Sequence, residues 1–234
     1  MELDKQKIMK PKVSVILPIY NQSSQIEYLF EQYISNLENL NVTWELLFVV
    51  NGSKDDSHKK ALVFSKQNPN VKTFNLEKGG WGRAVKFGLE NAQGELVCYT
   101  NSARTVVEDL ILVLKCALAN DDIVIKTTRV IRESFVRKIG SILYNYENRK
   151  LLGTPLWDVN GTPKVIPAKY LDGLTVISEG DLIDAEIMAK LYRKNVQLVE
   201  ILITSTKRIS GKSTTKFSSA LKMYTGLFKL KNQI

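Results

Sequence analysis

Basic side chains stand in predicted loops, and their chemistry is that of phosphate binding. Lys78 is followed by Gly79 and Gly80, and Arg83 comes just after a predicted helix start. Backbone N–H groups in such a loop and at a helix N-terminus can hold an anion, although a plain turn also explains the glycines. Arg104, in a later loop, carries a planar guanidinium that can hold phosphate through two hydrogen bonds. On local grounds alone, these residues fit either a site for a phosphorylated ligand or ordinary turns.

Carboxylates offer a second kind of chemistry further along the chain. Asp158 follows Trp157 in a segment rich in glycine and proline. A general base must lie close to the oxygen that it activates, and an aspartate in an irregular loop suits this role, although an ordinary loop or capping aspartate fits as well. Asp184 and Glu186 are two residues apart on a predicted helix, so we expect them to point in different directions.

Other kinds of site lack their residues. His58 is the only histidine, which excludes a histidine-dependent triad and a multi-histidine metal site. Cys98 and Cys116 lie in apolar runs without paired spacing, which excludes a disulfide scaffold and favours a reducing compartment. Helix-turn-helix, zinc-finger and RNA-binding signatures are absent, so we expect no nucleic-acid partner despite a pI of about 9.4.

An alternating pattern of elements must position these residues. The first half of the sequence alternates short apolar runs with helical patterns, which predicts an α/β fold: a mainly parallel sheet with helices on both faces. Ligands of such sheets bind beyond the carboxyl ends of the strands. The predicted strands are 13–17, 44–50, 71–75, 95–100 and 122–126, and the predicted helices are 24–40, 55–67, 80–92 and 106–119. The loops 18–24, 51–56, 75–83 and 100–107 are therefore expected to carry the site.

The second half of the sequence is less regular and more basic. It predicts a helix at 133–151, an irregular segment, a helix at 181–195, a strand at 197–203 and a final amphipathic helix. Residues 123–234 hold 19 Lys and Arg against 9 Asp and Glu. We expect one unit, in which residues 1–204 form the main domain and residues 205–234 form a basic loop and the C-terminal helix.

The charge pattern and the hydropathy bear on location. Residues 201–234 contain seven basic residues and no acidic one, a pattern that suits phosphates or an anionic membrane surface, although a solvated basic face is the alternative. No apolar stretch reaches the roughly 18 residues of a spanning helix, and the charged start shows no signal core. We expect a cytoplasmic protein, either free or peripheral on the cytoplasmic face of the membrane.

Several segments, from VSVILPIYNQ at 13–22 to RISGKS at 208–213, occur in an order that resembles family-2 inverting glycosyltransferases of the GT-A fold. The match starts with VSVILPIYNQ, similar to the opening strand and turn of the family, and extends over nearly the whole chain. Its last segment, RISGKS at 208–213, resembles the tail of the dolichol-phosphate mannose synthase branch. The matching segments are 13–22, 46–57, 75–80, 82–95, 157–161, 183–186 and 208–213. The resemblance implies that residues 1–204 form a GT-A glycosyltransferase domain.

This resemblance also implies roles for individual residues. A nucleotide-sugar donor would lie over the strand ends, and an acceptor oxygen would displace the nucleoside diphosphate with inversion. Asp158 is the candidate base. The implied donor-binding residues are Pro18, Tyr20, Gln22, Asn51, Ser53, Lys78, Gly79, Arg83, Asn101 and Ser102. Those implied to meet an acceptor or a lipid phosphate are Arg129, Arg132, Arg208, Lys212 and Ser213.

The sequence departs from the family at its donor-side acids. Gln22 replaces the usual Glu, and Val50 and Asn51 replace an Asp pair. The family's metal-binding Asp-x-Asp falls on residues 100–102, which read Thr-Asn-Ser. Because hard cations such as Mg²⁺ want at least one carboxylate oxygen as well as phosphates, a divalent metal (Mg or Mn) is disfavoured and no cofactor is expected.

Two hypotheses follow from this departure. In the first, the chain transfers sugar to an acceptor such as a polyprenyl phosphate or a glycan. Arg104, with Lys78 and Arg83, then replaces the metal as the catalytic cation that meets the leaving diphosphate. In the second, the chain is an inactive relative that binds a nucleotide, a glycan, a lipid phosphate or a partner subunit. The fold alone does not decide between them.

Overall fold

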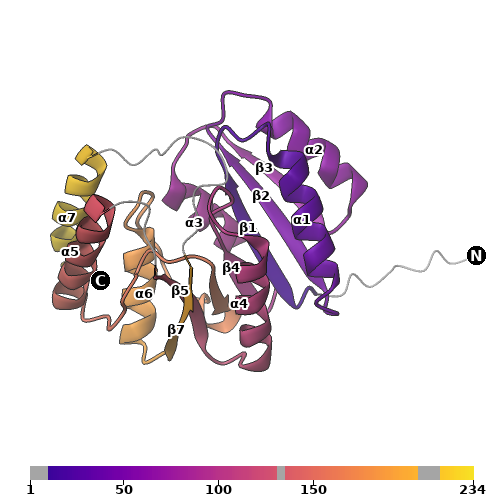
Figure 1. Cartoon of the computed structure of the whole chain (residues 1–234). Coiled ribbons are helices and arrows are strands. Elements are labelled where there is room, and N and C mark those ends of the chain that lie inside the picture. Colours follow the sequence, from indigo (N-terminus) through magenta and orange to yellow (C-terminus); the bar gives the residue numbers. More distant parts are fainter. Residues whose placement is uncertain (1–9, 131–134, 205–216) are drawn as a thin grey trace, which may run out of the picture.

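A seven-stranded sheet forms the centre of the described chain (Figure 1). The computed structural model describes residues 10–130, 135–204 and 217–234. The strands are β1 (Val13–Ile19), β2 (Trp44–Asn51), β3 (Val71–Leu76), β4 (Leu96–Tyr99), β5 (Val124–Arg129), β6 (Lys164–Pro167) and β7 (Leu198–Ile203), in the order β3-β2-β1-β4-β6-β5-β7. Only β6 among them runs antiparallel to its neighbours. The prediction of a mainly parallel sheet is confirmed.

Helices cover both faces of the sheet, as expected for strands that are apolar on both sides. Within β1, Val15 and Leu17 face one helical layer, whereas Ile16 faces the other. The first layer consists of α1 (Ile26–Glu38), α2 (Ser57–Gln67) and α4 (Val107–Ala119). The second consists of α3 (Trp81–Asn91), α5 (Phe135–Leu152), α6 (Ile183–Arg193) and α7 (Phe217–Lys231). A short 3₁₀ turn, Ala168–Tyr170, follows β6.

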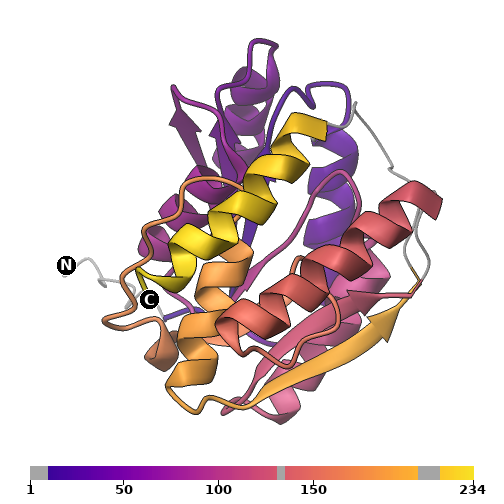
Figure 2. The same ribbon diagram turned by 90° about the vertical axis from the view of Figure 1, so that its left-hand side faces the viewer.

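The second layer has an inner and an outer part. Every residue from Ile183 to Ala189 in α6 is buried, because α6 lies between the sheet and the outer pair α5 and α7 (Figures 1 and 2). The predicted C-terminal helix packs on α5: Leu227 and Leu230 are buried, and the Tyr224 hydroxyl donates to the Gly140 carbonyl oxygen at 2.6 Å. None of the described helices has the length and hydropathy of a membrane-spanning segment.

Strand β6 was missed by the sequence analysis, which predicted an irregular segment there. Its four residues include Lys164 and Pro167 and show no strand pattern. All four are nevertheless buried, because β6 fills the position between β4 and β5. Tertiary pairing, and not local propensity, makes this segment a strand.

Candidate functional site

The loops after β1, β2 and β3 meet at the carboxyl edge of the sheet, where Asn51 joins them. The Asn51 side chain is buried, and its Nδ2 donates to the Ile19 carbonyl oxygen at 2.8 Å. Its Oδ1 accepts from the Gly80 N–H at 3.0 Å. The predicted donor-site residue Asn51 is therefore a structural link between the ends of β1 and β2 and the loop before α3.

Two glycines allow these loops to touch. Gly52 has a φ of +61°, and a Cβ atom built on it would lie 2.5 Å from the Gly79 nitrogen. A Cβ atom on Gly79 would lie 3.7 Å from the ring of Tyr20. Tyr20 is 42% exposed and Lys78 is exposed. The structure therefore brings together three predicted donor-site residues, Tyr20, Lys78 and Gly79, on one accessible surface.

Side-chain oxygens also tie the turn after β1 to the turn after β2. Ser53 Oγ accepts from the Asn21 N–H at 3.0 Å, and Asn21 Oδ1 accepts from the Lys54 N–H at 2.8 Å. Asp55 accepts from the Ser23 N–H at 2.9 Å. Burial opposes ionisation of Asp55, but its hydrogen bonds outweigh burial and hold its pKa below the ordinary value. Ser53 thus serves to fix these turns.

The loop after β4 docks on the end of β1 through Ser102. Its hydroxyl is buried, 2.9 Å from the Pro18 carbonyl oxygen and 2.8 Å from Gln22 Oε1. Gln22 is itself buried. The structure therefore brings the predicted residues Pro18, Gln22 and Ser102 into one hydrogen-bonded cluster.

The same loop supplies few ligands suited to a divalent metal. Thr100 and Thr105 hydroxyl oxygens lie 2.6 Å apart, and Asn101 Oδ1 accepts from the Ala103 N–H at 3.1 Å. Among the described residues, no group of three or more His, Cys, Asp and Glu side chains could hold a metal ion. Arg104 is half-buried in this turn, where its N–H donates to the Asn101 carbonyl oxygen at 2.9 Å.

Arg83 joins two loops in the structure. Its Nη1 donates to the Gly79 carbonyl oxygen at 2.8 Å, and its Nη2 pairs with Glu179 at 2.5 Å. Its backbone N–H donates to the Glu179 carbonyl oxygen at 2.9 Å. The guanidinium, predicted to meet a phosphate, thus holds the Glu179 loop against the start of α3.

Arg129 and Asp158 form a two-pronged ion pair at the carboxyl end of β5. Asp158 is 2% exposed, and it accepts from Arg129 Nε at 2.7 Å and from Nη2 at 2.9 Å. Burial disfavours the charge of Arg129, but the facing carboxylate outweighs burial and raises the pKa of Arg129. The structure thus joins a predicted acceptor residue to the predicted base. The other predicted acceptor residues, Arg132, Arg208, Lys212 and Ser213, lie outside the described residues.

Glu200, which the sequence analysis did not single out, supports the Asp158 loop. Its carboxylate accepts from the backbone N–H groups of Trp157 at 2.8 Å and Asp158 at 3.2 Å, and pairs with Lys126 at 2.6 Å. Burial lowers the pKa of the fully buried Lys126 to about 8, against the opposing effect of Glu200. One signal was in the sequence: Glu200 is the single charged residue of an otherwise apolar strand, where a buried carboxylate needs a partner.

A second buried ion pair links β6 to α6. The Lys164 ammonium is fully buried and contacts Asp184 Oδ1. Asp184 also accepts from the Tyr99 hydroxyl at 2.9 Å and from Trp81 Nε1 at 3.0 Å. Burial lowers the pKa of Lys164, and Asp184 opposes that shift. Asp184 thus links α6 to β4, β6 and α3 through one ion pair and two hydrogen bonds.

Glu186 points away from Asp184, as predicted, and holds the loop before α6. It accepts from the N–H groups of Ile177 at 2.8 Å and Ser178 at 2.7 Å, and pairs with Lys190 at 2.5 Å. Burial would raise its pKa, but the hydrogen bonds from Lys190 and the loop outweigh burial and lower it below the ordinary 4.5.

A pH dependence of stability follows from Glu186. The folded state binds this proton less tightly than the unfolded state, so the stabilisation is complete above about pH 5 and is lost as the pH falls through 4.5 and below. We expect the unfolding free energy, measured by urea titration at several pH values from about 6 to 3, to fall less steeply with decreasing pH in Glu186→Gln than in the wild type. The exposed control Glu38→Gln should keep the wild-type slope. Equal slopes for all three proteins would contradict the assignment.

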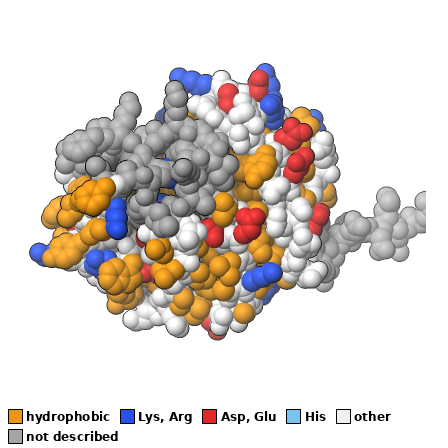
Figure 3. Space-filling view, in the orientation of Figure 1, with side chains coloured by type: hydrophobic (Ala, Val, Ile, Leu, Met, Phe, Trp, Pro, Cys, Tyr) orange, Lys and Arg blue, Asp and Glu red, His pale blue; other side chains and the backbone are white. Residues whose placement is uncertain are grey.

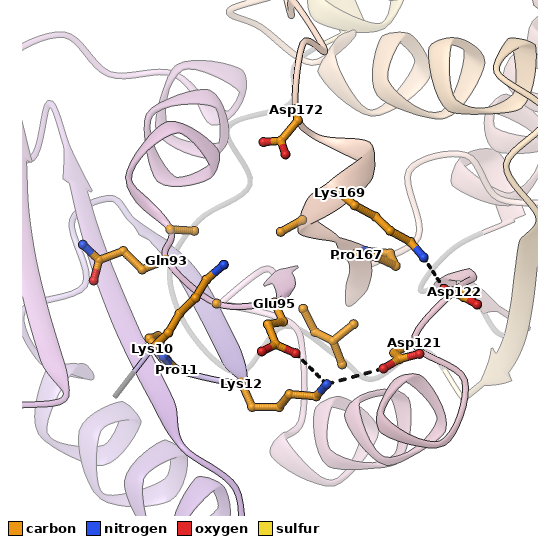
Figure 4. A pocket seen from close by; sticks show the side chains of 14 residues that line it. Lys10, Pro11, Lys12, Gln93, Glu95, Asp121, Asp122, Pro167, Lys169 and Asp172 are labelled. Carbon is orange, nitrogen blue, oxygen red and sulfur yellow. Dashed lines mark hydrogen bonds and ion pairs between the residues drawn. The ribbon is translucent and has the colours of Figure 1, made fainter. Parts of the chain in front are cut away.

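A hollow of about 770 Å³ lies at the opposite, amino-terminal edge of the sheet (Figure 4). Its charged side chains pair with one another: Lys12 lies 2.7 Å from Glu95 and 3.4 Å from Asp121, and Lys169 contacts Asp122. These pairs account for five of the hollow's charged side chains, and the hollow lies away from the loops described above.

Comparisons with known proteins agree with the sequence pattern. Residues 14–174 match the family model described as glycosyl transferase family 2. The undecaprenyl-phosphate 4-deoxy-4-formamido-L-arabinose transferase of Proteus mirabilis is 24% identical over 209 residues, 88% of this chain and 63% of that protein. The dolichyl-phosphate beta-glucosyltransferase ALG5D of Trichomonas vaginalis is 29% identical over 150 residues, 56% of this chain and 46% of that protein. The chain spans less than a third of three uncharacterised bacterial glycosyltransferases that it also matches.

Solved structures share the fold. Glucosyl-3-phosphoglycerate synthase from Mycobacterium tuberculosis, in complex with Mn²⁺, UDP and glucosyl-3-phosphoglycerate, superimposes with a TM-score of 0.69. The likeness covers 94% of this chain and 78% of that protein, at 15% sequence identity. The expected GT-A fold is therefore confirmed.

Proposed function

Because the chain belongs to family 2 of the glycosyltransferases, we propose that it moves a sugar from a nucleoside diphosphate to an acceptor phosphate, with inversion at the anomeric carbon. The observation that carries this proposal is the Arg129–Asp158 pair. Asp158 fixes the Arg129 guanidinium at the carboxyl edge of the sheet, where it could bind an acceptor phosphate near the proposed donor loops. Two relatives named above act on undecaprenyl phosphate and dolichyl phosphate, which supports a lipid phosphate as the acceptor.

The donor is proposed to lie against the loops after β1, β2 and β3. Tyr20, Lys78 and Gly79 form the accessible part of this surface. Asn51, Ser53 and Ser102 would act one step behind them, by holding the loops in place. An aromatic ring for stacking, an ammonium group and a glycine backbone suit a nucleoside diphosphate.

The residues at the family's metal motif do not fit a Mg²⁺ or Mn²⁺ ion. Residues 100–102 supply only hydroxyl and amide oxygens, and the Ser102 hydroxyl is already used on β1. Such ions are usually held by at least one carboxylate together with the substrate phosphates, and the side chains of residues 100–102 supply no carboxylate. We therefore propose that Arg104 and Lys78, in place of a metal ion, stabilise the negative charge of the leaving diphosphate.

The acceptor side follows from the chemistry of phosphate. An acceptor oxygen attacks the anomeric carbon, the bond from that carbon to the diphosphate oxygen breaks, and the nucleoside diphosphate leaves with the electron pair. A phosphate monoester has a second pKa of about 6, so its oxygen is already ionised near neutral pH and needs no base. Asp158 is then proposed to hold Arg129 toward the acceptor. With a hydroxyl acceptor, Asp158 would be the base.

A binding protein without turnover is the second candidate. The observation that favours it is the internal use of the polar groups at the former metal motif, where Thr100 bonds to Thr105 and Ser102 to β1. Such a protein would hold a nucleoside diphosphate on the Tyr20 and Lys78 surface and leave the sugar in place.

Transfer assays separate the two candidates. UDP- and GDP-sugars labelled in the sugar would be incubated with undecaprenyl or dolichyl phosphate in detergent, and lipid-linked label would be counted. We expect label in the lipid fraction for at least one donor. If every donor leaves the lipid unlabelled while calorimetry detects nucleoside diphosphate binding, the transferase proposal fails and the binding protein stands.

Chelation tests the metal-free assignment. Excess EDTA is expected to leave the initial rate within about twofold, and added Mg²⁺ or Mn²⁺ should not raise it, because no carboxylate site is there to fill. A metal-dependent glycosyltransferase in the same assay is the control and should lose its activity. Loss of this chain's rate on chelation, with recovery on adding metal, would contradict the assignment.

A further inference from the structure

Helix α5 has large apolar side chains on its outward face. Those exposed side chains, here called the α5 stripe, are Phe135, Ile139, Ile142, Leu143 and Tyr146, each between 43% and 75% exposed. Their spacing of three and four residues places them in one line along the helix. A surface helix of a monomeric soluble protein normally carries polar residues there, and exposed apolar groups in such numbers mark an interaction surface.

The inward face of α5 carries buried polar side chains, although the inward face of a surface helix is usually apolar. Asn145 is buried and accepts from the Val159 N–H at 2.9 Å, and the buried Asn148 bonds to the Thr154 hydroxyl at 2.5 Å. These amides hold the chain on both sides of Asp158, at Thr154 and at Val159. The α5 stripe is thus not needed to attach the helix to the domain and is available to a partner.

Exposed lysines occur on α5 and on the helix beside it. Helix α7 lies beside α5, joined to it by the edge-on contact of Tyr144 with Tyr224 (Figure 2). In the space-filling view, hydrophobic and basic side chains occur together over these two helices, at the left (Figure 3). The exposed lysines of the pair are Lys138, Lys150, Lys222, Lys229 and Lys231, and the only acid in either helix is Glu147.

An apolar line flanked by lysines matches one partner, the surface of an anionic lipid bilayer. A helix of this kind lies in the interfacial plane with its apolar side chains among the acyl chains and its cations at the headgroups. A second copy of the chain fits less well, because two copies paired through this face would bring their lysines together. We propose that the α5 stripe and its lysines dock this protein on anionic membranes.

Two neighbouring features agree with this docking. Trp157 is 73% exposed and lies beside α5, 5.0 Å from the guanidinium of Arg149, and tryptophan favours the membrane interface. Phe135, at the start of α5, follows β5 and its Arg129 after a short connection. The docked face would therefore adjoin the Arg129–Asp158 pair. The inference does not depend on sugar transfer.

Flotation with vesicles tests the proposal on the full chain. At low salt, we expect the protein to float with vesicles of phosphatidylcholine and phosphatidylglycerol and to stay behind with phosphatidylcholine alone. Ile142→Glu and Leu143→Glu should each lower the bound fraction about tenfold or more, because each places a charge among acyl chains. The control Leu112→Glu, at an exposed position on α4, should float like the wild type.

Further measurements keep the outcome clear. Because Ile142 and Leu143 are exposed, the variants should retain the wild-type urea midpoint, which shows that they fold. Lys138→Glu should weaken binding and reduce its salt dependence. Failure of the wild type to float, or equal flotation of all variants, overturns the proposal. Self-association that Ile142→Glu abolishes, without flotation, would assign the stripe to a second copy instead.

Discussion

Replacing Arg104 with alanine is expected to lower kcat for sugar transfer by about 10²-fold, equal to about 3 kcal/mol of transition-state stabilisation. Charge accumulates on the diphosphate as the sugar bond breaks, and Arg104 stands in the β4–α4 loop where the family would place a metal. The loss should fall on kcat more than on KM, because this charge is largest in the transition state.

The matched control for this experiment is Arg193→Ala. Arg193 ends α6 at the opposite edge of the sheet and is exposed, so its removal should leave kcat unchanged. Arg104→Lys should retain part of the rate, since it keeps the charge but not the two-pronged geometry. A wild-type kcat in Arg104→Ala would remove this residue from the mechanism.

Replacing Lys164 with methionine is expected to lower the free energy of unfolding by about 3 to 5 kcal/mol. The ammonium is fully buried against Asp184, so its removal leaves a carboxylate without its charge partner inside the protein. The hydrogen bonds from Tyr99 and Trp81 would remain and compensate only in part. Urea denaturation followed by circular dichroism measures the change.

Two further variants test whether burial of the pair causes the loss of stability. Lys59→Met breaks the exposed pair with Asp56 and should change stability by less than about 1 kcal/mol. The double variant Lys164→Met, Asp184→Leu should recover part of the loss, because an apolar pair replaces the buried charges. If Lys164→Met alone unfolds at the wild-type urea concentration, the buried pair does not stabilise the fold.

Much of the fold could be predicted because its signals are local. Strands β1, β2 and β4 are short, mostly apolar runs, and α1 to α4 appear in the sequence as periodic segments with ends close to those observed. Strand β6 could not be predicted in this way. Its residues become a strand only because β4 and β5 lie on either side of it, and that arrangement depends on contacts distant in sequence.

Part of the candidate site could be predicted from local sequence signals, and part depends on contacts distant in sequence. Tyr20, Lys78 and Gly79 could be placed together from motif order alone. The ion pair of Arg129 with Asp158 spans 29 residues, and that of Lys126 with Glu200 spans 74. Such pairs follow from strand order, which periodicity does not reveal. For the same reason, the sequence predicted a helix at 133–151 but not which of its apolar side chains would be exposed.

The close approach of Gly52 to Gly79 limits how the donor surface can move. With backbone packed against backbone, the segments after β2 and β3 have no room to slide past one another, and Asn51 fastens both to β1. This wall should act as a rigid body. If the proposed sugar transfer requires the site to open and close, we expect the movement on the side of the Arg129–Asp158 pair.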